Sequence, residues 1–156
     1  MGSGGRVFAL AHSGSILYVG GNFTNAGGVP ANYIAQWNGS TWSALGTGAN
    51  APIQSMAIAP NGDLYVGGDF TNVGGVSVSA LARWNGSAWS DVGGGVDYVD
   101  PTTTPRIDSL AFDAAENLYV GGTFDQAGTG LLPVRNIAKW NGSNWSAVGA
   151  RVDGTD

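Results

Sequence analysis

The chain has 156 residues, of which 43% are hydrophobic and 11% charged, and this composition excludes a disordered polypeptide. The net charge is −5 and Lys plus Arg number only six, so no basic surface is available for nucleic acid. Cysteine is absent, which excludes disulfides, and no apolar run approaches the roughly 18 residues that a membrane-spanning helix needs.

Along the chain, residues 1–5 have no apolar segment of the signal-peptide kind and are expected to be an expression leader. The first strand is predicted at Val7 to His12. A short turn leads to a second strand that contains Leu17 to Gly21. A third strand is predicted at Tyr33 to Trp37, and a fourth begins near Trp42 and ends at Leu45.

This four-strand pattern occurs three times. Leu-Tyr-Val-Gly-Gly occupies residues 17–21, 64–68 and 118–122, and Trp-Asn-Gly-Ser-x-Trp occupies 37–42, 84–89 and 140–145. Repeats of this length indicate one supersecondary unit stacked on itself. The units are predicted at 6–49, 50–95 and 96–156. The remaining predicted strands are Ile53 to Ala59, Ala80 to Trp84, a strand ending at Val92, Ile107 to Phe112, Asn136 to Trp140, and a strand ending at Val148.

Each unit reads as an antiparallel meander. Short β-rich runs alternate with Gly, Asn, Pro and Ser, and no segment has a helical period. The turn between the third and fourth strands is Asn-Gly in every unit, a pair that suits a tight hairpin because both residues tolerate positive φ.

The tryptophans are predicted to share one face of each sheet. A two-residue turn at Asn38-Gly39 pairs Trp37 with Ser40, whereas a four-residue loop pairs Trp37 with Trp42. Both registers place Trp37 and Trp42 on the same face, because strand faces alternate with period two. The repeat positions committed to this framework are Gly20, Gly21, Trp37, Trp42, Gly67, Gly68, Trp84, Trp89, Gly121, Gly122, Trp140 and Trp145.

The second strand is apolar on both faces, through Leu64 and Val66 on one and Tyr65 on the other. A sheet of this kind must be covered on both sides. The first strand carries small residues such as Ser55 and Ala57, as expected at the hub of a ring. Four-stranded sheets repeated radially make a β-propeller, so the prediction is an all-β chain with three four-stranded antiparallel blades.

The pattern resembles a known family. A Gly-Gly pair that closes the second strand (Gly20-Gly21) and a Trp that opens the fourth (Trp42) resemble the kelch-type blade of galactose-oxidase-like propellers. The third strand ends in Trp-Asn-Gly, in place of the Tyr or Asp-Pro usual in kelch, and resembles more closely the kelch-like repeats of large bacterial surface or secreted proteins. The resemblance implies an extracellular or cell-surface parent, with this chain made in the cytoplasm. It implies a fold and no activity, because nothing matches the copper ligands of the oxidase.

Three blades do not close a ring, since propellers typically carry roughly four to eight. The apolar faces at both ends of the chain are expected to be uncovered. The leading hypothesis is head-to-tail assembly: two copies make six blades, and three copies make nine as the alternative. Val152-Asp153 repeats Val96-Asp97, so the chain is expected to be cut from a longer array at a blade boundary. A parent with further blades therefore stays open, and the fragment would then aggregate or be partly molten.

Binding is predicted on the side of the disc that holds the variable connections. Loops on a rigid scaffold often carry binding sites, although a solvated loop explains the same residues. The candidate ligand-binding residues are Asp97, Tyr98, Asp100, Arg106, Asp125 and Arg135.

No catalytic set, metal site or cofactor is predicted. His12 is the only histidine and is expected at a solvated turn, and the carboxylates form no acid–base pair at a defined spacing. The predicted function is a non-enzymatic repeat scaffold whose partner is itself, with neither nucleic acid nor membrane as partner. A carbohydrate- or protein-binding module is the alternative, and a fragment of a propeller enzyme is the least favoured reading.

Overall fold

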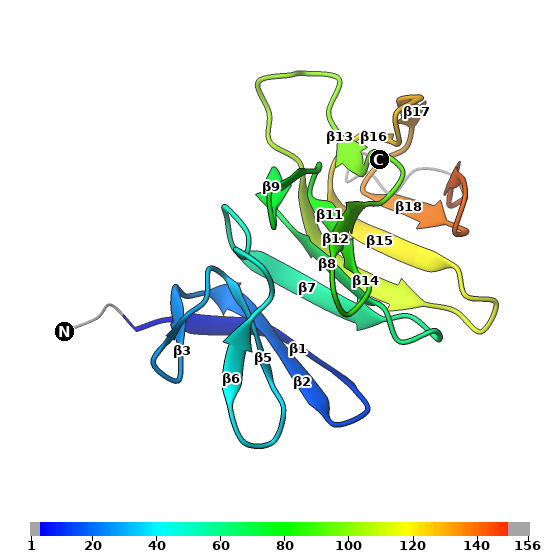
Figure 1. Cartoon of the computed structure of the whole chain (residues 1–156). Helices are drawn as coiled ribbons and strands as arrows, with labels where there is room; N and C mark the ends of the chain where they lie inside the picture. The colour runs from blue at the N-terminus through cyan, green and yellow to red at the C-terminus, as the bar shows by residue number, and fades with distance from the viewer. Residues whose placement is uncertain (1–3, 150–156) are drawn as a thin grey trace.

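The computed structural model describes residues 4–149, and its regular secondary structure is entirely β-strand. Three four-stranded antiparallel sheets follow one another along the chain, one for each repeat (Figure 1). These sheets are named blades 1, 2 and 3 in chain order. The predicted all-β class is therefore confirmed, while parts of the predicted leader and tail (1–3 and 150–156) lie outside the described residues.

The twelve blade strands follow the predicted order. Blade 1 consists of β1 (Arg6–Ser13), β2 (Ile16–Asn22), β5 (Ile34–Trp37) and β6 (Trp42–Ala44). Blade 2 consists of β7 (Ile53–Ile58), β8 (Leu64–Gly68), β11 (Leu81–Trp84) and β12 (Trp89–Asp91). Blade 3 consists of β14 (Arg106–Phe112), β15 (Leu118–Thr123), β18 (Ile137–Trp140) and β19 (Trp145–Ala147).

Seven further strands, each of two residues, lie in connections that the sequence analysis treated as loops. They form two hairpins and one three-stranded sheet. The hairpins are β3 (Asn25–Ala26) with β4 (Val29–Pro30), and β9 (Asn72–Val73) with β10 (Val76–Ser77). The three-stranded sheet is β13 (Val96–Asp97), β16 (Gln126–Ala127) and β17 (Leu132–Pro133).

The third strand of every blade begins one residue later than predicted. Tyr33, Ala80 and Asn136 have φ values of 66°, 62° and 62°, which are outside the extended region. Their amides bond back to the preceding connection, as Tyr33 N does to Phe23 O at 2.8 Å. Tyr and Ala do not favour this conformation, so composition did not reveal it. The predicted strand ends at Leu45, Val92 and Val148 are each one residue too late.

The hairpin between the third and fourth strands uses the longer of the two registers. Trp37 pairs with Trp42, leaving a four-residue loop. Only Gly39 has a positive φ, at 95°, so the two-residue turn with both residues at positive φ is wrong. Asn38 instead organises the loop through its Oδ1, which accepts the amides of Ser40 and Thr41 at 2.9 and 2.8 Å.

The predicted clustering of tryptophans on one face is confirmed in all three blades. The ring centroids of the paired tryptophans are 5.3, 5.2 and 5.3 Å apart, with the planes tilted by 46–50°. This tilted arrangement is one that aromatic pairs prefer over a face-to-face sandwich.

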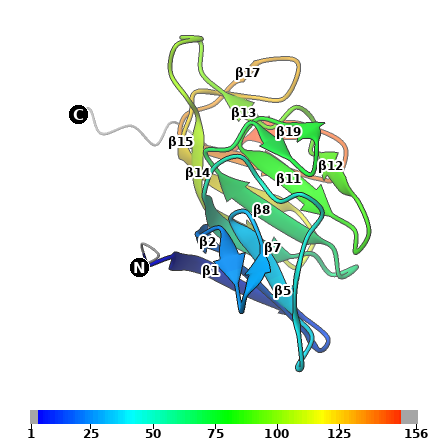
Figure 2. The same ribbon diagram turned by 60° about the vertical axis from the view of Figure 1, so that its left-hand side comes forward.

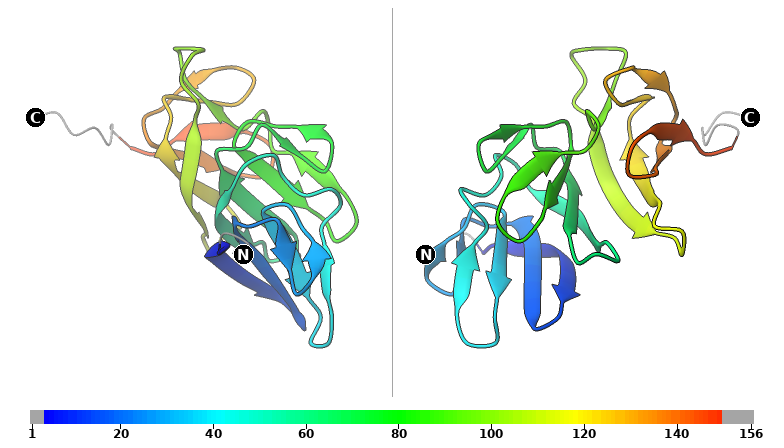
Figure 3. Two further views of the ribbon diagram at one scale, coloured as in Figure 1. Left: turned by 90° about the vertical axis from the view of Figure 1, so that its left-hand side faces the viewer. Right: turned by 45° about the vertical axis from the view of Figure 1, so that its right-hand side comes forward.

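The blades form a fan, with blade 2 between blades 1 and 3 (Figures 1 and 3). The first strands contact each other in sequence, β1 against β7 and β7 against β14, and the turned view shows them side by side (Figure 2). This confirms that the first strand lies at the hub. Every residue of β8 is buried, as expected of a sheet covered on both faces.

The apolar core has two parts, one in each seam between consecutive blades. The first seam buries side chains such as Ile34 and Leu45 of blade 1 against Leu64 and Trp89 of blade 2. The second seam buries Leu81 and Val92 of blade 2 against Leu118 and Val120 of blade 3. The stability of the chain therefore depends on contacts between blades as much as on contacts within them.

Candidate functional site

The two seams show how one blade docks on the next. Ile53 of β7 lies against Gly20 of β2, where an added Cβ would be only 2.7 Å from Ile53 Cγ2. Ile107 of β14 takes the corresponding place against Gly67. Both isoleucines are 0% exposed. The first Gly of each Gly-Gly pair is thus a socket for an apolar side chain of the following blade.

The second Gly of the pair has a different role. An added Cβ at Gly21 or Gly122 would meet the carbonyl oxygen of Arg6 or Arg106 in the first strand of the same blade. The absence of a side chain therefore lets the first two strands approach beside the bulge in the first strand.

Indole hydrogen bonds also cross the seams. Trp89 Nε1 donates to the carbonyl oxygen of Leu45 at 3.0 Å, and Trp145 Nε1 donates to that of Gly93 at 3.1 Å. In both seams the tryptophan of the fourth strand is bonded to a carbonyl that lies just after the fourth strand of the preceding blade. The partner matters because a buried indole N–H is costly to leave unpaired.

The connections that leave blades 1 and 2 pair with a connection of the following blade. Ala49 forms a bridge with Val73, and Val96 pairs with Ala127. The adjoining amides donate back to the connection, Gly74 N to Gly48 O at 2.8 Å and Gly128 N to Gly95 O at 2.9 Å. The contacts place these connections on one side of the disc, as predicted.

The outer face of blade 1 carries the same docking residues without a blade against them in residues 4–149. Val7 occupies the position of Ile53 and is 55% exposed, and Leu10 occupies that of Met56 and is 61% exposed. Trp42 Nε1, unlike its two counterparts, bonds to no acceptor within the described residues. The predicted uncovered apolar face is therefore present at this end.

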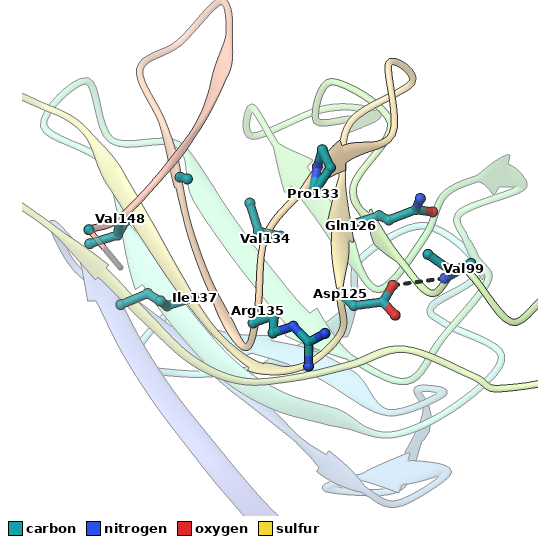
Figure 4. A pocket seen from close by; sticks show the side chains of 10 residues that line it. Val99, Asp125, Gln126, Pro133, Val134, Arg135, Ile137 and Val148 are labelled. Carbon is teal, nitrogen blue, oxygen red and sulfur yellow. Dashed lines mark hydrogen bonds between the residues drawn. The ribbon is translucent and has the colours of Figure 1, made fainter. Parts of the chain in front are cut away.

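The outer face of blade 3 carries the complementary half. The Cβ position of Gly121 is open, the nearest side-chain atom being Ser109 Cβ at 3.7 Å. Ile137 and Val148 are half-buried and line a pocket of about 210 Å³ (Figure 4). Their counterparts in blades 1 and 2, which face a following blade, are at most 3% exposed: Ile34, Leu45, Leu81 and Val92.

Tyrosine burial follows the same division. Tyr18 and Tyr65 face the internal seams, and burial raises the pKa of both phenols, an effect that Arg83 partly opposes at Tyr65. Tyr119, the counterpart in blade 3, is half-buried, and its pKa is raised by desolvation and by the Asp113 carboxylate.

Three of the six candidate ligand-binding residues come together. Asp125 and Arg135 line the pocket on blade 3 (Figure 4), and Asp97 lies beside them because its carbonyl oxygen accepts the Asp125 amide at 3.0 Å. Asp125 Oδ1 also accepts the amide of Val99 at 2.7 Å. The pocket therefore presents one cation and one carboxylate whose position is held by the loop.

The other three candidates, Asp100, Arg106 and Tyr98, form contacts with residues close to them in the sequence. Asp100 organises its own turn by accepting bonds from Thr102 and Thr103, and the amide and hydroxyl of Thr102 hold the pKa of this carboxyl below its usual value. Arg106 Nε lies 2.7 Å from Asp108 Oδ1, and Tyr98 donates its amide to the adjacent carboxylate. Their contribution to binding stays a prediction.

In the part of the chain that the structure describes, no three His, Cys, Asp or Glu side chains gather in a way that could hold a metal ion. His12 is exposed, as expected, but it lies within β1 and pairs with Leu17. Ile58 and Phe112 take the same register position in blades 2 and 3, so the predicted turn position of His12 is wrong. No helix among the described residues is long and apolar enough to cross a membrane.

Sequence reasoning missed the docking role of the first Gly and the pairing of the connections. The signal for the socket was present, because each Gly-Gly pair is matched by an Ile or Val early in a first strand. The two-residue strands have no periodicity to detect, since they depend on bonds to a neighbouring blade.

Four-stranded antiparallel sheets packed face to face around a common hub define the β-propeller class. The chain is similar to the model of one such family, described as a domain of unknown function (DUF5122) β-propeller, over residues 13–39 and 59–87. Each matched segment runs from the first turn of a blade through its third strand. Neither the curated proteins nor the solved structures show a significant match to the chain. The finer resemblance to kelch-type repeats stays a prediction.

Proposed function

We propose that this chain is a non-enzymatic scaffold that assembles head to tail with a second copy and closes a six-bladed propeller. The outer face of blade 3 in one copy packs against the outer face of blade 1 in the next. The observation that carries the proposal is that each outer face holds one half of the seam found twice inside the chain.

The halves match residue by residue. Val7 has the place of the isoleucines that fill the internal sockets, and Gly121 is the socket left open. The indole N–H of Trp42 has no acceptor within residues 4–149. Inside the chain the acceptors are the carbonyls of Leu45 and Gly93, and Val148 and Gly149 occupy the corresponding positions of blade 3. A new seam would therefore repeat contacts that this sequence already forms.

The number of copies follows from blade count. Two chains of three blades supply six, within the roughly four to eight typical of propellers, whereas three chains supply nine. Such an interface joins two different surfaces, so it gives a closed ring only if the rotation between copies returns to the start.

Apolar burial supplies the driving force. Each fully buried Val or Leu side chain contributes roughly 1.5–3 kcal/mol, and Val7 and Leu10 are both more than half exposed.

Sedimentation velocity tests the assembly. The expected mass is about 31.6 kDa, twice the 15.8 kDa of one chain. Leu10→Glu places a charge in the new seam and is expected to shift the protein toward one chain. Leu131→Glu is the matched control, because Leu131 is 52% exposed on the connection between β16 and β17.

A cooperatively folded chain with the mass of a single copy at every concentration would contradict the proposal. Equal dissociation by the two Glu variants would contradict the assigned faces. A mass of three chains would favour the nine-bladed ring.

Ligand binding at the variable connections is the second candidate function. Its support is the pocket of about 210 Å³ that Asp125 and Arg135 line on blade 3. Binding of a glycan or peptide by the chain, with loss of that binding in Arg135→Ala, would favour this function over a purely structural role.

A further inference from the structure

Each blade is followed by a connection that begins in the same way. After the fourth strand comes a six-residue run, which reads Leu-Gly-Thr-Gly-Ala-Asn at 45–50, Val-Gly-Gly-Gly-Val-Asp at 92–97 and Val-Gly-Ala-Arg-Val-Asp at 148–153. The third run starts inside the described residues and ends outside them. Its last two residues, Val152 and Asp153, repeat Val96 and Asp97.

The first two runs form backbone bonds with two consecutive blades. The amide of Ala49 donates to Asn32 O in its own blade at 3.0 Å, and that of Val96 donates to Ser79 O at 3.2 Å. On the other side they pair with β9 and β16 of the following blade. The third run also begins with an apolar residue followed by Gly. In its own blade, Arg135 occupies the repeat position of Asn32 and Ser79, the residues whose carbonyls accept bonds from the first two runs.

The two pairs across the seams have the same combined side-chain volume, because each consists of one Ala and one Val. Ala49 lies opposite Val73, and Val96 lies opposite Ala127, so each seam combines one small and one larger residue. All four side chains are at most 8% exposed. A pair of two valines would overfill this site, and a pair of two alanines would leave a cavity.

In blade 1 the corresponding hairpin has no such strand beside it in residues 4–149. Ala26 of β3 is half-buried, although its counterparts Val73 and Ala127 are at most 1% exposed. A hollow of about 280 Å³ lies against it, lined by Gly5, Val7, Val19, Phe23, Asn25, Ala26 and Trp42.

Resting on the proposed head-to-tail assembly, we infer that residues 150–153 of one copy add as a strand to β3 of the next copy, with Val152 opposite Ala26. The pairing reproduces the combination of a small and a larger residue seen in both internal seams. The occupant of the hollow is therefore the tail of a second copy, and the strand is added to an exposed hairpin edge.

Asp153 has two counterparts, Asn50 and Asp97. Asp97 accepts the amide of Asp125 in the following connection through its backbone carbonyl, whereas Asn50 uses its side chain. Asn50 accepts the amides of Thr71 and Asn72 through Oδ1, both at 3.0 Å, and this is the arrangement that fits the register inferred for Asp153. Blade 1 offers the same two residue types, Thr24 and Asn25, at the corresponding positions. A carboxylate oxygen accepts such bonds at least as strongly as an amide oxygen.

Truncation of the full chain tests the tail. Removal of residues 151–156 deletes the pairing strand, and removal of 154–156 is the matched control that keeps Val152 and Asp153. The expected result is at least a tenfold rise in the dimer dissociation constant for the longer deletion and less than a twofold change for the control. Melting of each variant at a concentration below dissociation checks that the single chain remains folded.

A volume swap tests the register. Ala26→Val alone is expected to raise the dissociation constant several-fold, because it places two valines opposite each other. Adding Val152→Ala is expected to restore association, since that pair reproduces Ala49 with Val73. Val is tolerated at this hairpin position in a single chain, because blade 2 carries it as Val73.

The outcomes separate the two proposals. If the unmodified chain never associates, the proposed function fails and this inference fails with it. If it associates and the longer deletion associates equally well, only the tail inference is overturned. Failure of the Val152→Ala change to restore Ala26→Val would overturn the assigned register.

Discussion

At the scale of single residues, two adjacent glycines have separate physical jobs. The second lets the first two strands of its own blade approach, whereas the first receives an apolar side chain from the following blade. Gly20 and Gly67 are filled in this way, and Gly121 is open. The same glycine position is therefore filled by a neighbouring side chain in the internal seams and unfilled on the outer face of blade 3.

Gly67→Ala and Gly121→Ala form a matched pair. Gly67→Ala is expected to destabilise the single chain by about 1–3 kcal/mol, because its Cβ would collide with Ile107. Gly121→Ala is expected to change that free energy of unfolding by less than about 0.5 kcal/mol, because its nearest contacts are ordinary. Under the proposed assembly it raises the dissociation constant. Urea unfolding at low concentration and sedimentation measure the two effects, and equal loss of stability would contradict the socket.

At the scale of the element, several hairpins are held by one polar side chain that accepts more than one hydrogen bond, as at Asn38, Asn85, Asn141 and Asp113. In the β14–β15 turn, Asp113 Oδ1 accepts the amides of Ala115 and Asn117 at 2.9 Å, and Oδ2 accepts Asn117 Nδ2 at 2.8 Å. Hydrogen bonds from Asn117, chiefly that of its side chain, hold the pKa of Asp113 below its usual value. These bonds stabilise the ionised form.

Acid is therefore expected to loosen this turn. The folded pKa lies below the unfolded one, so the contribution is complete above about pH 4 and is lost as pH falls through the folded value. The melting temperature should fall less steeply below pH 4 in Asp113→Asn than in the unmodified chain. Glu116→Gln removes an exposed carboxylate in the same turn and is the control. Identical acid profiles for all three proteins would contradict the role of Asp113.

At the scale of the whole molecule, the three blades have nearly the same sequence and unequal environments. Blade 2 is covered on both faces, and every residue of β8 is buried. Blades 1 and 3 each have one uncovered face, where Leu10 and Val148 are partly or largely exposed. The same repeat is therefore expected to be most stable in the middle of the chain.

Amide exchange measures this gradient. In dilute protein, β8 is expected to exchange more slowly than β2 and β15, its counterparts in the outer blades, because opening β8 requires disruption of both seams. At concentrations that favour assembly, protection is expected to rise in β1, β3 and β18 while β8 changes little. Uniform protection of the three blades in the dilute chain would contradict the gradient, and concentration-independent exchange would contradict the assembly.

Much of the fold could be predicted because the repeat aligns residues with the same local role. The shared face of Trp37 and Trp42 followed from strand periodicity, and the hub position of the first strand followed from its small side chains. The hairpin register did not follow, because the loop is held by the Asn38 side chain and not by backbone preference. The late start of β5, β11 and β18 depends on bonds to the preceding connection. Among the candidate binding residues, the proximity of Asp97, Asp125 and Arg135 could not be predicted, because it depends on the paths of the connecting loops.

The repeat period and the local chemistry of the strands are enough to give the number of repeat units, their strand order and the shared face of each tryptophan pair. Which apolar side chains are covered depends on how the blades pack in three dimensions. Coverage is a property of blades packed against each other, and equal side chains such as Trp42 and Trp89 differ only in whether a preceding blade supplies the acceptor for the indole.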